Sequence, residues 1–183
     1  MKKKSKRKSR VGKIIFLLIV VGIGFSIFFF HEEIFKVFKP LERKEVLLYF
    51  SDGEGEYLVG EKREILKKDE VKEEAKEAII ELIKGPKGKL IPTLPSQTEL
   101  LDLELSKAGV AKVNFNKALS KDHPGGSSAE IMTLYSIVNS LALNFPQIKQ
   151  VQIFIEGKAI ETIAGHLSLR QPIPPKPDLI KRQ

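Results

Sequence analysis

The sequence contains no cysteine and no tryptophan, and histidine occurs only three times in its 183 residues. Without cysteine the chain has no disulfide framework, no thiol nucleophile, no cysteine-based zinc site and no residue for thiol lipidation. No pair of histidines has the spacing of metal ligands, so a zinc site has no support either. We therefore expect the chain to bind no metal and no cofactor.

Acidic residues are absent before Glu32, whereas eight cations lie between Lys2 and Lys13. The whole chain has 31 Lys and Arg against 23 Asp and Glu, a formal net charge of +8, so the part after this tail is neutral. A basic protein is a candidate for nucleic-acid binding, but here the excess charge is confined to one short segment. We expect no nucleic-acid partner; the alternative, DNA binding by residues 1–13 alone, predicts strong salt dependence.

The residues from Ile14 to Phe30 form a run of 17 without a charge. As a helix this run is about 25 Å long, and extension back to Val11 brings it to about 30 Å, the thickness of a bilayer core. Its end at Phe28–Phe30 lacks the small residues of a signal-peptidase site, which favours an uncleaved anchor. Because cations stay on the inner side, we predict a cytoplasmic tail at 1–13, a single transmembrane helix at 14–30 and an extracytoplasmic remainder.

The extracytoplasmic part divides by composition into three segments. Residues 31–44 are amphipathic and contain Pro40, which indicates a juxtamembrane linker. Residues 45–172 carry regular apolar patterns and form the predicted domain. Residues 173–183 are rich in proline, which favours an extended and uncompacted tail.

Apolar patterns predict three pairs of strands in the domain: the first strand is a short run that is apolar on both faces, and in the later strands apolar residues alternate with polar ones. Turn residues separate the two members of each pair. The pairs are Val46–Phe50 with Tyr57–Ile65, Leu101–Leu105 with Ala111–Phe115, and Val151–Ile155 with an extended segment at Lys158–Leu169.

Two amphipathic helices lie between these pairs. The first covers Lys67–Lys84, with Asp69 as its N-cap and Gly85-Pro86 as its end. The second begins at Ser127, where Ser127 and Glu130 match a capping box, and it ends before Pro146. The element order predicts an α+β fold: an open sandwich of a mostly antiparallel sheet with two helices on one face.

The candidates for chemistry are few. Asp122, His123, Ser127 and Ser128 lie together in one loop, but the members of a hydrolase triad come from distant segments, so the capping interpretation is favoured. A helix that starts with Gly-Gly-Ser-Ser can bind phosphate through its backbone N–H groups, but the lysine of a P-loop is missing here. We interpret His166 as structural, and the acidic residues of the first helix as a solvated face: Glu70, Glu73, Glu74, Glu77 and Glu81. We predict no catalytic residue and no enzyme.

Taken in order, these blocks resemble the GerMN domain, the sporulation and spore germination domain. The resemblance covers about residues 46–172 and includes Arg63 at the centre of one block. The blocks are LYFSD from Leu48, LVGEKREI from Leu58, ELIKGPKG from Glu81, PTLPSQTELLDLEL from Pro92, VAKVNFNKAL from Val110, the helix GGSSAEIMTLYSIVNSL from Gly125, and VQIFIEGK from Val151 followed by GHLSLRQPI.

This resemblance implies a non-catalytic extracytoplasmic domain. GerMN domains are similar to ring-building domains, which pack a pair of helices on a small sheet and assemble side by side. Better-known members carry two such domains on a lipidated cysteine and serve the apparatus that joins forespore and mother cell. This chain departs from them, since it has one copy and a predicted membrane helix in place of the lipidated cysteine.

Our leading hypothesis is a membrane-anchored assembly or binding module of the bacterial cell envelope. Its expected partners are other envelope or membrane proteins, or further copies of itself. The surfaces available for association are the sheet edges, the solvated sheet face and the loops Ser51–Gly55 and His123–Ser127. The alternative is a peptidoglycan-associated enzyme, or the glycan-binding domain of one.

Overall fold

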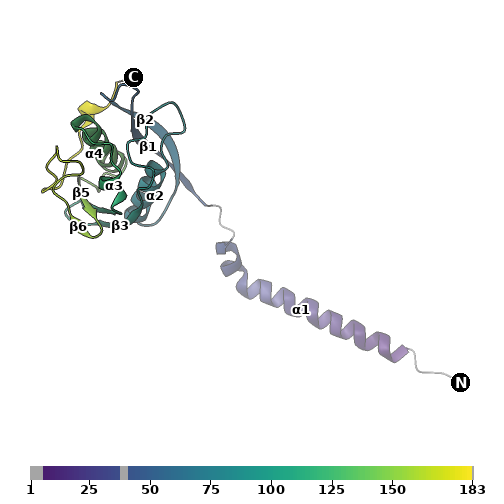
Figure 1. Cartoon of the computed structure of the whole chain (residues 1–183). Helices are drawn as coiled ribbons and strands as arrows, with labels where there is room; N and C mark the ends of the chain where they lie inside the picture. Colours follow the sequence, from purple (N-terminus) through teal and green to yellow (C-terminus); the bar gives the residue numbers. More distant parts are fainter. Residues whose placement is uncertain (1–5, 38–40, 183) are drawn as a thin grey trace. The chain divides into compact units, whose positions relative to one another are not determined.

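The computed structural model of the chain describes residues 6–37 and 41–182 (Figure 1). The chain divides into two compact units, residues 1–41 and residues 42–183, and each is described by itself.

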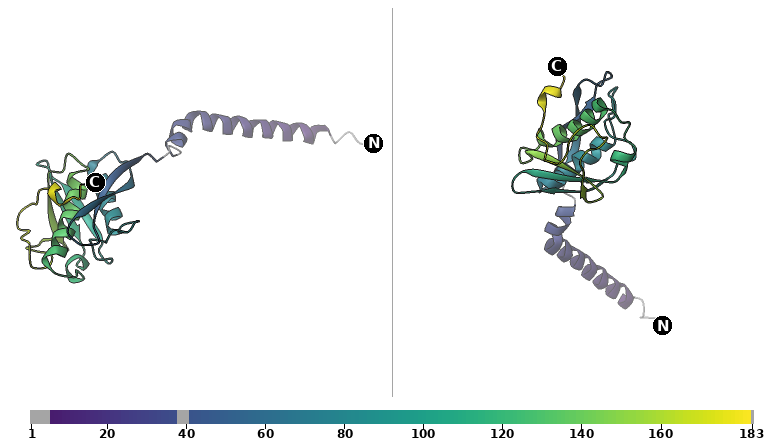
Figure 2. Two further views of the ribbon diagram at one scale, coloured as in Figure 1. Left: turned by 90° about the horizontal axis from the view of Figure 1, so that it is seen from above. Right: turned by 60° about the vertical axis from the view of Figure 1, so that its left-hand side comes forward.

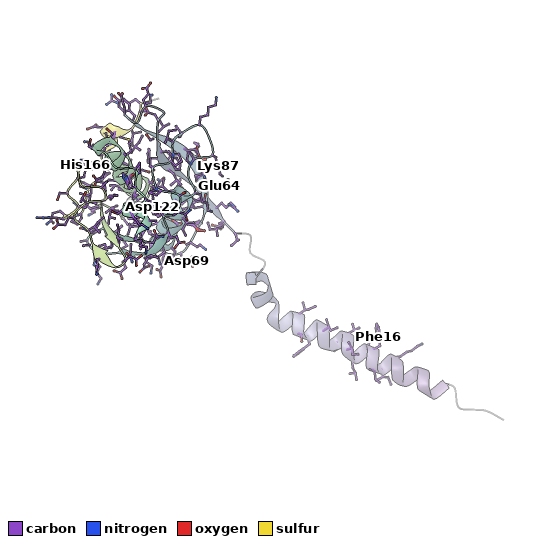
Figure 3. The ribbon with its side chains drawn as sticks, viewed as in Figure 1. Phe16, Glu64, Asp69, Lys87, Asp122 and His166 are labelled. Atoms are coloured by element: carbon purple, nitrogen blue, oxygen red, sulfur yellow. The ribbon has the colours of Figure 1, made fainter. Side chains whose placement is uncertain are left out.

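The first unit contains the helix α1 (Lys6–Val37). Its described side chains are those of residues 12–27, and all of them are exposed; Figure 3 labels Phe16, whose ring projects from this helix. Among the described residues, no helix has both the length and the apolar character needed to cross a membrane. The predicted basic tail (1–13) and linker (31–44) lie largely outside the residues whose side chains are described.

The second unit contains two β-sheets (Figure 1). The first is the antiparallel hairpin of β1 (Arg43–Ser51) and β2 (Leu58–Leu66). The second has the order β3-β4-β5-β6, and its strands are β3 (Leu100–Leu105), β4 (Val110–Phe115), β5 (Gln150–Ile155) and β6 (Lys158–Ala159).

The prediction of a single sheet is therefore wrong, while the mostly antiparallel pairing is confirmed, since three of the four strand pairs in the described part of the chain are antiparallel. The strands form two sheets, and β4 pairs with β5 in parallel. Parallel neighbours need a long crossover connection, and the segment between them supplies it with α3 (Ala118–Lys121) and α4 (Ser127–Ala142). The α+β class itself is confirmed.

One hydrophobic core joins the two sheets to α4 and to α2 (Val71–Ile83). Figure 2 shows these helices among the strands in two further views. Burial of such side chains contributes about 25 cal/mol per Å² of apolar surface removed from water. The largest fully buried side chains include Leu48, Phe50, Ile79, Leu103, Phe115, Ile137 and Phe145.

Both predicted N-caps are wrong, whereas the predicted end of the first helix at Gly85 is confirmed, since Gly85 has a positive φ directly after the C-cap Lys84. α2 begins after Glu70, and α4 begins after Gly126; neither of these N-cap residues makes a side-chain cap hydrogen bond. The chain enters α4 through Gly125 and Gly126, which both have positive φ, so Ser127 already lies inside the helix. Glu130 therefore does not close a capping box and points to another segment.

The predicted strand at Lys158–Leu169 is also mostly absent. Only β6 is a strand there, and the residues after it form a loop that contacts α4. In β3, an irregularity between Leu100 and Asp102 interrupts the alternation and leaves Leu101 exposed.

The C-terminal segment (residues 173–181) packs on the domain, contrary to the expectation of an uncompacted tail. Ile173 forms an antiparallel bridge with Val151 of β5. The Asn139 amide exchanges two hydrogen bonds with the Lys176 backbone, of 2.8 and 3.1 Å. After the short 3-10 helix η1 (Pro177–Leu179), the Lys181 N–H donates to the Leu58 carbonyl at 2.8 Å. The segment therefore connects the second sheet, α4 and β2.

Polar side chains of α4 and the residues after it close the outer edge of β1. The Asn144 amide accepts from the Leu47 N–H at 2.9 Å and donates to the Leu47 carbonyl at 2.6 Å. The Ser140 hydroxyl accepts from the Tyr49 N–H at 3.0 Å. Further along, the backbones of Ser51 and Ile91 exchange two hydrogen bonds. The outward backbone groups of Leu47, Tyr49 and Ser51 thus find hydrogen-bond partners without another strand.

Candidate functional site

A cavity of about 450 Å³ opens where the β1–β2 turn, the segment 91–95 and the first turns of α4 meet. Concave, mainly apolar sites of this size are the usual places for ligands or inserted side chains. The wall is mostly apolar, with Ile91, Pro92, Leu94, Pro95, Pro124, Ala129 and Met132, and its other members are Ser51, Gly55, Thr93 and Ser128.

Asp52 fixes the turn that forms one wall. Its buried carboxylate accepts hydrogen bonds from the backbone N–H groups of Glu56 (3.1 Å) and Tyr57 (3.4 Å), and Lys181 Nζ lies 3.3 Å away. Burial acts to raise the pKa of Asp52, but these hydrogen bonds and the lysine charge together lower it. Asp52 therefore stays ionised and holds the turn in shape.

His123 ties the other walls together. Its Nδ1 accepts from the Gly125 N–H at 3.0 Å, and its Nε2 lies 3.0 Å from the Thr133 hydroxyl. Thr133 in turn donates to the Thr93 carbonyl at 2.5 Å. We assign the neutral tautomer with the proton on Nε2 from this pattern. Burial lowers the pKa of His123, although the charge of Glu130 acts to raise it.

Glu130, on α4 behind the cavity, is fully buried and holds the loop after β6. Its carboxylate accepts from the Thr162 hydroxyl (2.5 Å) and from three backbone N–H groups, those of Ile163 (2.9 Å), Ala164 (3.0 Å) and His166 (2.8 Å). Burial acts to raise the pKa of Glu130, but the four hydrogen bonds outweigh it and lower the pKa. This carboxylate positions a loop and has no acceptor capacity directed at the cavity.

The residues considered for a triad do not form one. Asp122 is exposed and follows α3, and Ser127 and Ser128 are exposed at the start of α4. Both ring nitrogens of His123 are occupied as described above, and among residues 41–182 no hydrogen bond joins this ring to either serine or to Asp122. Figure 3 labels Asp122 and His166; the second contributes its backbone N–H to Glu130.

The acidic face of α2 is not wholly solvated, contrary to the sequence interpretation. Glu74 is buried and contacts Lys44 Nζ at 2.8 Å. Glu81 lies 3.5 Å from the guanidinium of Arg63, whose side chain is 2% exposed. Arg63 also donates to Glu61 and to the Gly85 carbonyl, each at 2.8 Å. Arg63 therefore fixes the end of α2 to β2 and acts structurally.

Nothing in the described residues resembles a metal centre: no group of three or more His, Asp or Glu side chains among them has the geometry to hold an ion. Sequence reasoning missed the roles of Glu130 and Thr133. Glu130 fits the capping-box pattern equally well, and a threonine inside a helix carries no signal that a histidine ten residues earlier is its partner.

The fold and the cavity together define the class: an α+β domain with an apolar cavity between α4, the β1–β2 turn and the segment 91–95. The family model Germane, described as sporulation and spore germination, matches residues 47–161, which is more than half of the chain. The chain belongs to this family, and the resemblance to the GerMN domain is confirmed. No curated protein sequence matches the chain.

Solved structures of GerMN domains and of a candidate lipoprotein are similar to this chain. A protein of Clostridium perfringens described as a candidate lipoprotein is 25% identical over 79% of this chain and 97% of its own, with a TM-score of 0.53. The first GerMN domain of the sporulation protein GerM from Bacillus subtilis is 20% identical over 72% of this chain and 97% of its own, with a TM-score of 0.56. The tandem GerMN domains of the same protein are 18% identical, with a TM-score of 0.56; the match covers 75% of this chain and 48% of the tandem. The last two likenesses concern the fold alone.

Proposed function

We propose that the chain is a non-catalytic assembly module of the bacterial cell envelope, that it is anchored in the cytoplasmic membrane with its domain outside, and that it acts in sporulation or germination. Membership of the Germane family supports a role in sporulation or germination. The likeness to a candidate lipoprotein supports a place in the envelope. The partners are envelope or membrane proteins, including further copies of this chain.

One observation carries the choice of binding over catalysis. The polar groups around the cavity are used to hold its walls: Asp52 holds the turn, and His123 and Thr133 hold the loop to the segment 91–95. A general base needs a free ring nitrogen or carboxylate within hydrogen-bond reach of a substrate. An apolar concavity with a rigid frame is suited to receive a side chain or segment of a partner.

The anchor is supported by the sequence. Ile14–Phe30 has no charge and follows eight cations, and a cationic flank stays inside. In intact spheroplasts, external protease should remove the domain and spare an epitope at residue 2. A mature protein that begins after Phe30, or shaving of the first residues with the domain intact, would contradict the anchor.

The binding function is tested by a photo-crosslinking amino acid at the cavity. Ile91 lines the cavity and is 48% exposed, so its replacement by benzoylphenylalanine places the reactive group at the rim. We expect one discrete adduct with an envelope protein or with a second copy after irradiation of cells. The matched control is the same group at Lys107, which is exposed in the β3–β4 turn.

Two results would contradict the binding function, and one of them would favour the alternative, a peptidoglycan-associated enzyme. Equal adduct patterns at positions 91 and 107 would remove the cavity from the binding function. Turnover of purified peptidoglycan by residues 42–183 would replace the proposed function with the enzyme.

A further inference from the structure

The two edges of the β1–β2 hairpin differ in the hydrogen-bond partners of their outward backbone groups. In an antiparallel pair, residues alternate between those that bond to the partner strand and those that point away. The backbone N–H groups of Leu47, Tyr49 and Ser51 point away from β2. They donate instead to Asn144, Ser140 and Ile91. The β1 edge is therefore closed between Leu47 and Ser51.

The same alternation identifies the outward groups of β2. The cross-strand partners of Ser51, Tyr49 and Leu47 are Leu58, Gly60 and Lys62, so these residues and Glu64 point outward. Leu58 confirms this, since its carbonyl accepts from the Lys181 N–H and it bridges Ile180 in parallel. The C-terminal segment thus begins a new strand on this edge and leaves it after one bridge.

Beyond Leu58, the edge is open. Within the part of the chain that the structure describes, the backbone N–H and C=O groups of Gly60, Lys62 and Glu64 have no hydrogen-bond partner. Lys62 and Glu64 are exposed, and Gly60 is half-buried. We name the outward backbone groups of these three residues the β2 edge. Unpaired groups of this kind are a template for an additional strand.

The charges on this strand favour one occupant. Glu64 lies directly opposite Glu45 in the hairpin, while Lys62 lies opposite the apolar Leu47. Like charges directly opposite each other are destabilising, and opposite charges stabilise by a similar amount. Lys62 lies 2.8 Å from Glu45, but Glu64 has only a distant contact of 3.9 Å with Arg43. The edge therefore presents the Lys62 ammonium two residues from the Glu64 carboxylate, which has no closer cation than Arg43 among the described residues of its own copy.

We propose that the β2 edge pairs with the β2 edge of a second copy, antiparallel and about a two-fold axis at Arg63, so that Lys62 of each copy faces Glu64 of the other. Gly60 then faces Leu66, and the ladder stops at Leu58, where the C-terminal segment occupies the edge. A shift by two residues places Lys62 on Lys62 or Glu64 on Glu64, which selects the proposed register. The inference rests on the proposed assembly function and names one of its partners.

Arg63 at the axis does not oppose this pairing. Its side chain is turned into the domain, where Glu61 and Glu81 balance its charge. The charged inter-copy contact on the solvated face is then the one between Lys62 and Glu64.

The absence of cysteine permits a direct test by disulfide formation in the full chain in detergent. A chain with Lys62→Cys is mixed with a chain with Glu64→Cys under mild oxidation. In the proposed register these two Cα atoms are about 5.5 Å apart, within the range of a disulfide. Two copies of either single variant place their cysteines about 8–9 Å apart, so each alone should remain unlinked. A mixture of Lys107→Cys and Glu54→Cys, both exposed away from the edge, measures random collision.

A second measurement needs no disulfide. Lys62→Glu should weaken dimerisation about tenfold in sedimentation experiments, because both symmetric pairs become repulsive. Lys62→Glu combined with Glu64→Lys should restore it, since the exchanged charges remain complementary in this register.

Each result has one meaning. Linking of the mixed pair above the control, with charge-swap rescue, supports the interface. Linking within a single variant overturns the register. Association by sedimentation without linking of the mixed pair overturns this interface and leaves the assembly function standing. A strict monomer overturns the self-pairing, while an adduct at position 91 would still uphold the proposed function.

Discussion

Glu130 is the residue whose environment most constrains the chain around it. A buried carboxylate that accepts four hydrogen bonds fixes the loop after β6 to α4, and the bonds keep it ionised. This arrangement couples one side chain to the positions of three backbone N–H groups between Ile163 and His166. The loop has almost no strand structure, and Glu130 holds it together with the Ser120 hydroxyl, which donates to the Ile163 carbonyl at 2.7 Å.

Replacement of Glu130 by Gln should lower the free energy of unfolding by about 1–3 kcal/mol, because the amide NH₂ cannot accept the hydrogen bonds that the carboxylate oxygen accepted. Urea unfolding checks the value. Glu161→Gln is the matched control, since Glu161 makes only an exposed ion pair with Arg170, and such pairs contribute about 0–1 kcal/mol. Equal losses in the two variants would contradict the role of Glu130.

Protonation of His123 should contribute to the pH dependence of the unfolding free energy. Burial lowers its pKa from the ordinary value of 6.5, so the unfolded chain takes up the proton at a higher pH than the folded one. The stabilisation is therefore full above pH 6.5 and is lost as the pH falls below that value.

The slope of unfolding free energy between pH 7 and 5.5 checks this effect. It should be smaller in His123→Asn than in the natural chain. His166→Asn is the control, because only the backbone of His166 contacts Glu130; an unchanged slope in His123→Asn would refute the prediction.

Residue roles were the part of the site least accessible to sequence reasoning. The sequence places His123 near two serines and an aspartate, but its partners, Gly125 and Thr133, are common residues without a motif. The same limit applies to Glu130, whose position three residues after Ser127 fits a cap that the positive φ of Gly126 prevents.

At the scale of elements, α4 acts as an edge cover as well as a core helix. Its buried face includes hydroxyl groups that bond to β1, among them Ser140, which accepts from the Tyr49 N–H. Hydroxyls in a helix interior are usually neutral or unfavourable. Here they replace a neighbouring strand.

Ser140→Ala should therefore cost about 1–3 kcal/mol of unfolding free energy, because the Tyr49 N–H loses its acceptor in a buried site. Thermal or urea unfolding measures this cost. Ser128→Ala, an exposed serine of the same helix, should stay within about 0.5 kcal/mol of the natural chain. Similar values for both would show that water satisfies the β1 edge.

The hairpins and helices were predictable because each has its own period of apolar residues. Ala111, Val113 and Phe115 alternate with polar residues, Ala75, Ile79 and Leu82 follow a helical stripe, and all six are buried. Alternation reports which face of a strand is buried but not which strand lies beside it. The division into two sheets and the parallel β4–β5 pair therefore could not be derived from the pattern.

At the scale of the whole molecule, the C-terminal segment connects parts that are distant in sequence. It contacts β5 through Ile173, α4 through Lys176 and β2 through Ile180. Its prolines predicted an extended chain, and the conformation is indeed mostly irregular; the packing was missed because single apolar residues such as Ile173 and Ile180 give no period.

Removal of residues 173–183 should lower the unfolding free energy by about 2–4 kcal/mol, since Leu179 and Ile180 leave the cluster around Tyr49 and Leu58 and Asn139 loses both partners. Urea unfolding of residues 42–172 against 42–183 gives the difference. Lys181→Ala is the control, because it removes one partly exposed ion pair and should cost under about 1 kcal/mol. Equal stability of residues 42–172 and 42–183 would contradict the packing described.

The cover that α4 lays along β1 has a consequence for stoichiometry. A hairpin with one blocked side and one free side can recruit a single neighbour and is then saturated, so growth through it terminates at a pair. A ring or filament that includes the β2 pairing must also use a second, unlike surface, and a closed ring of this kind then has an even number of copies.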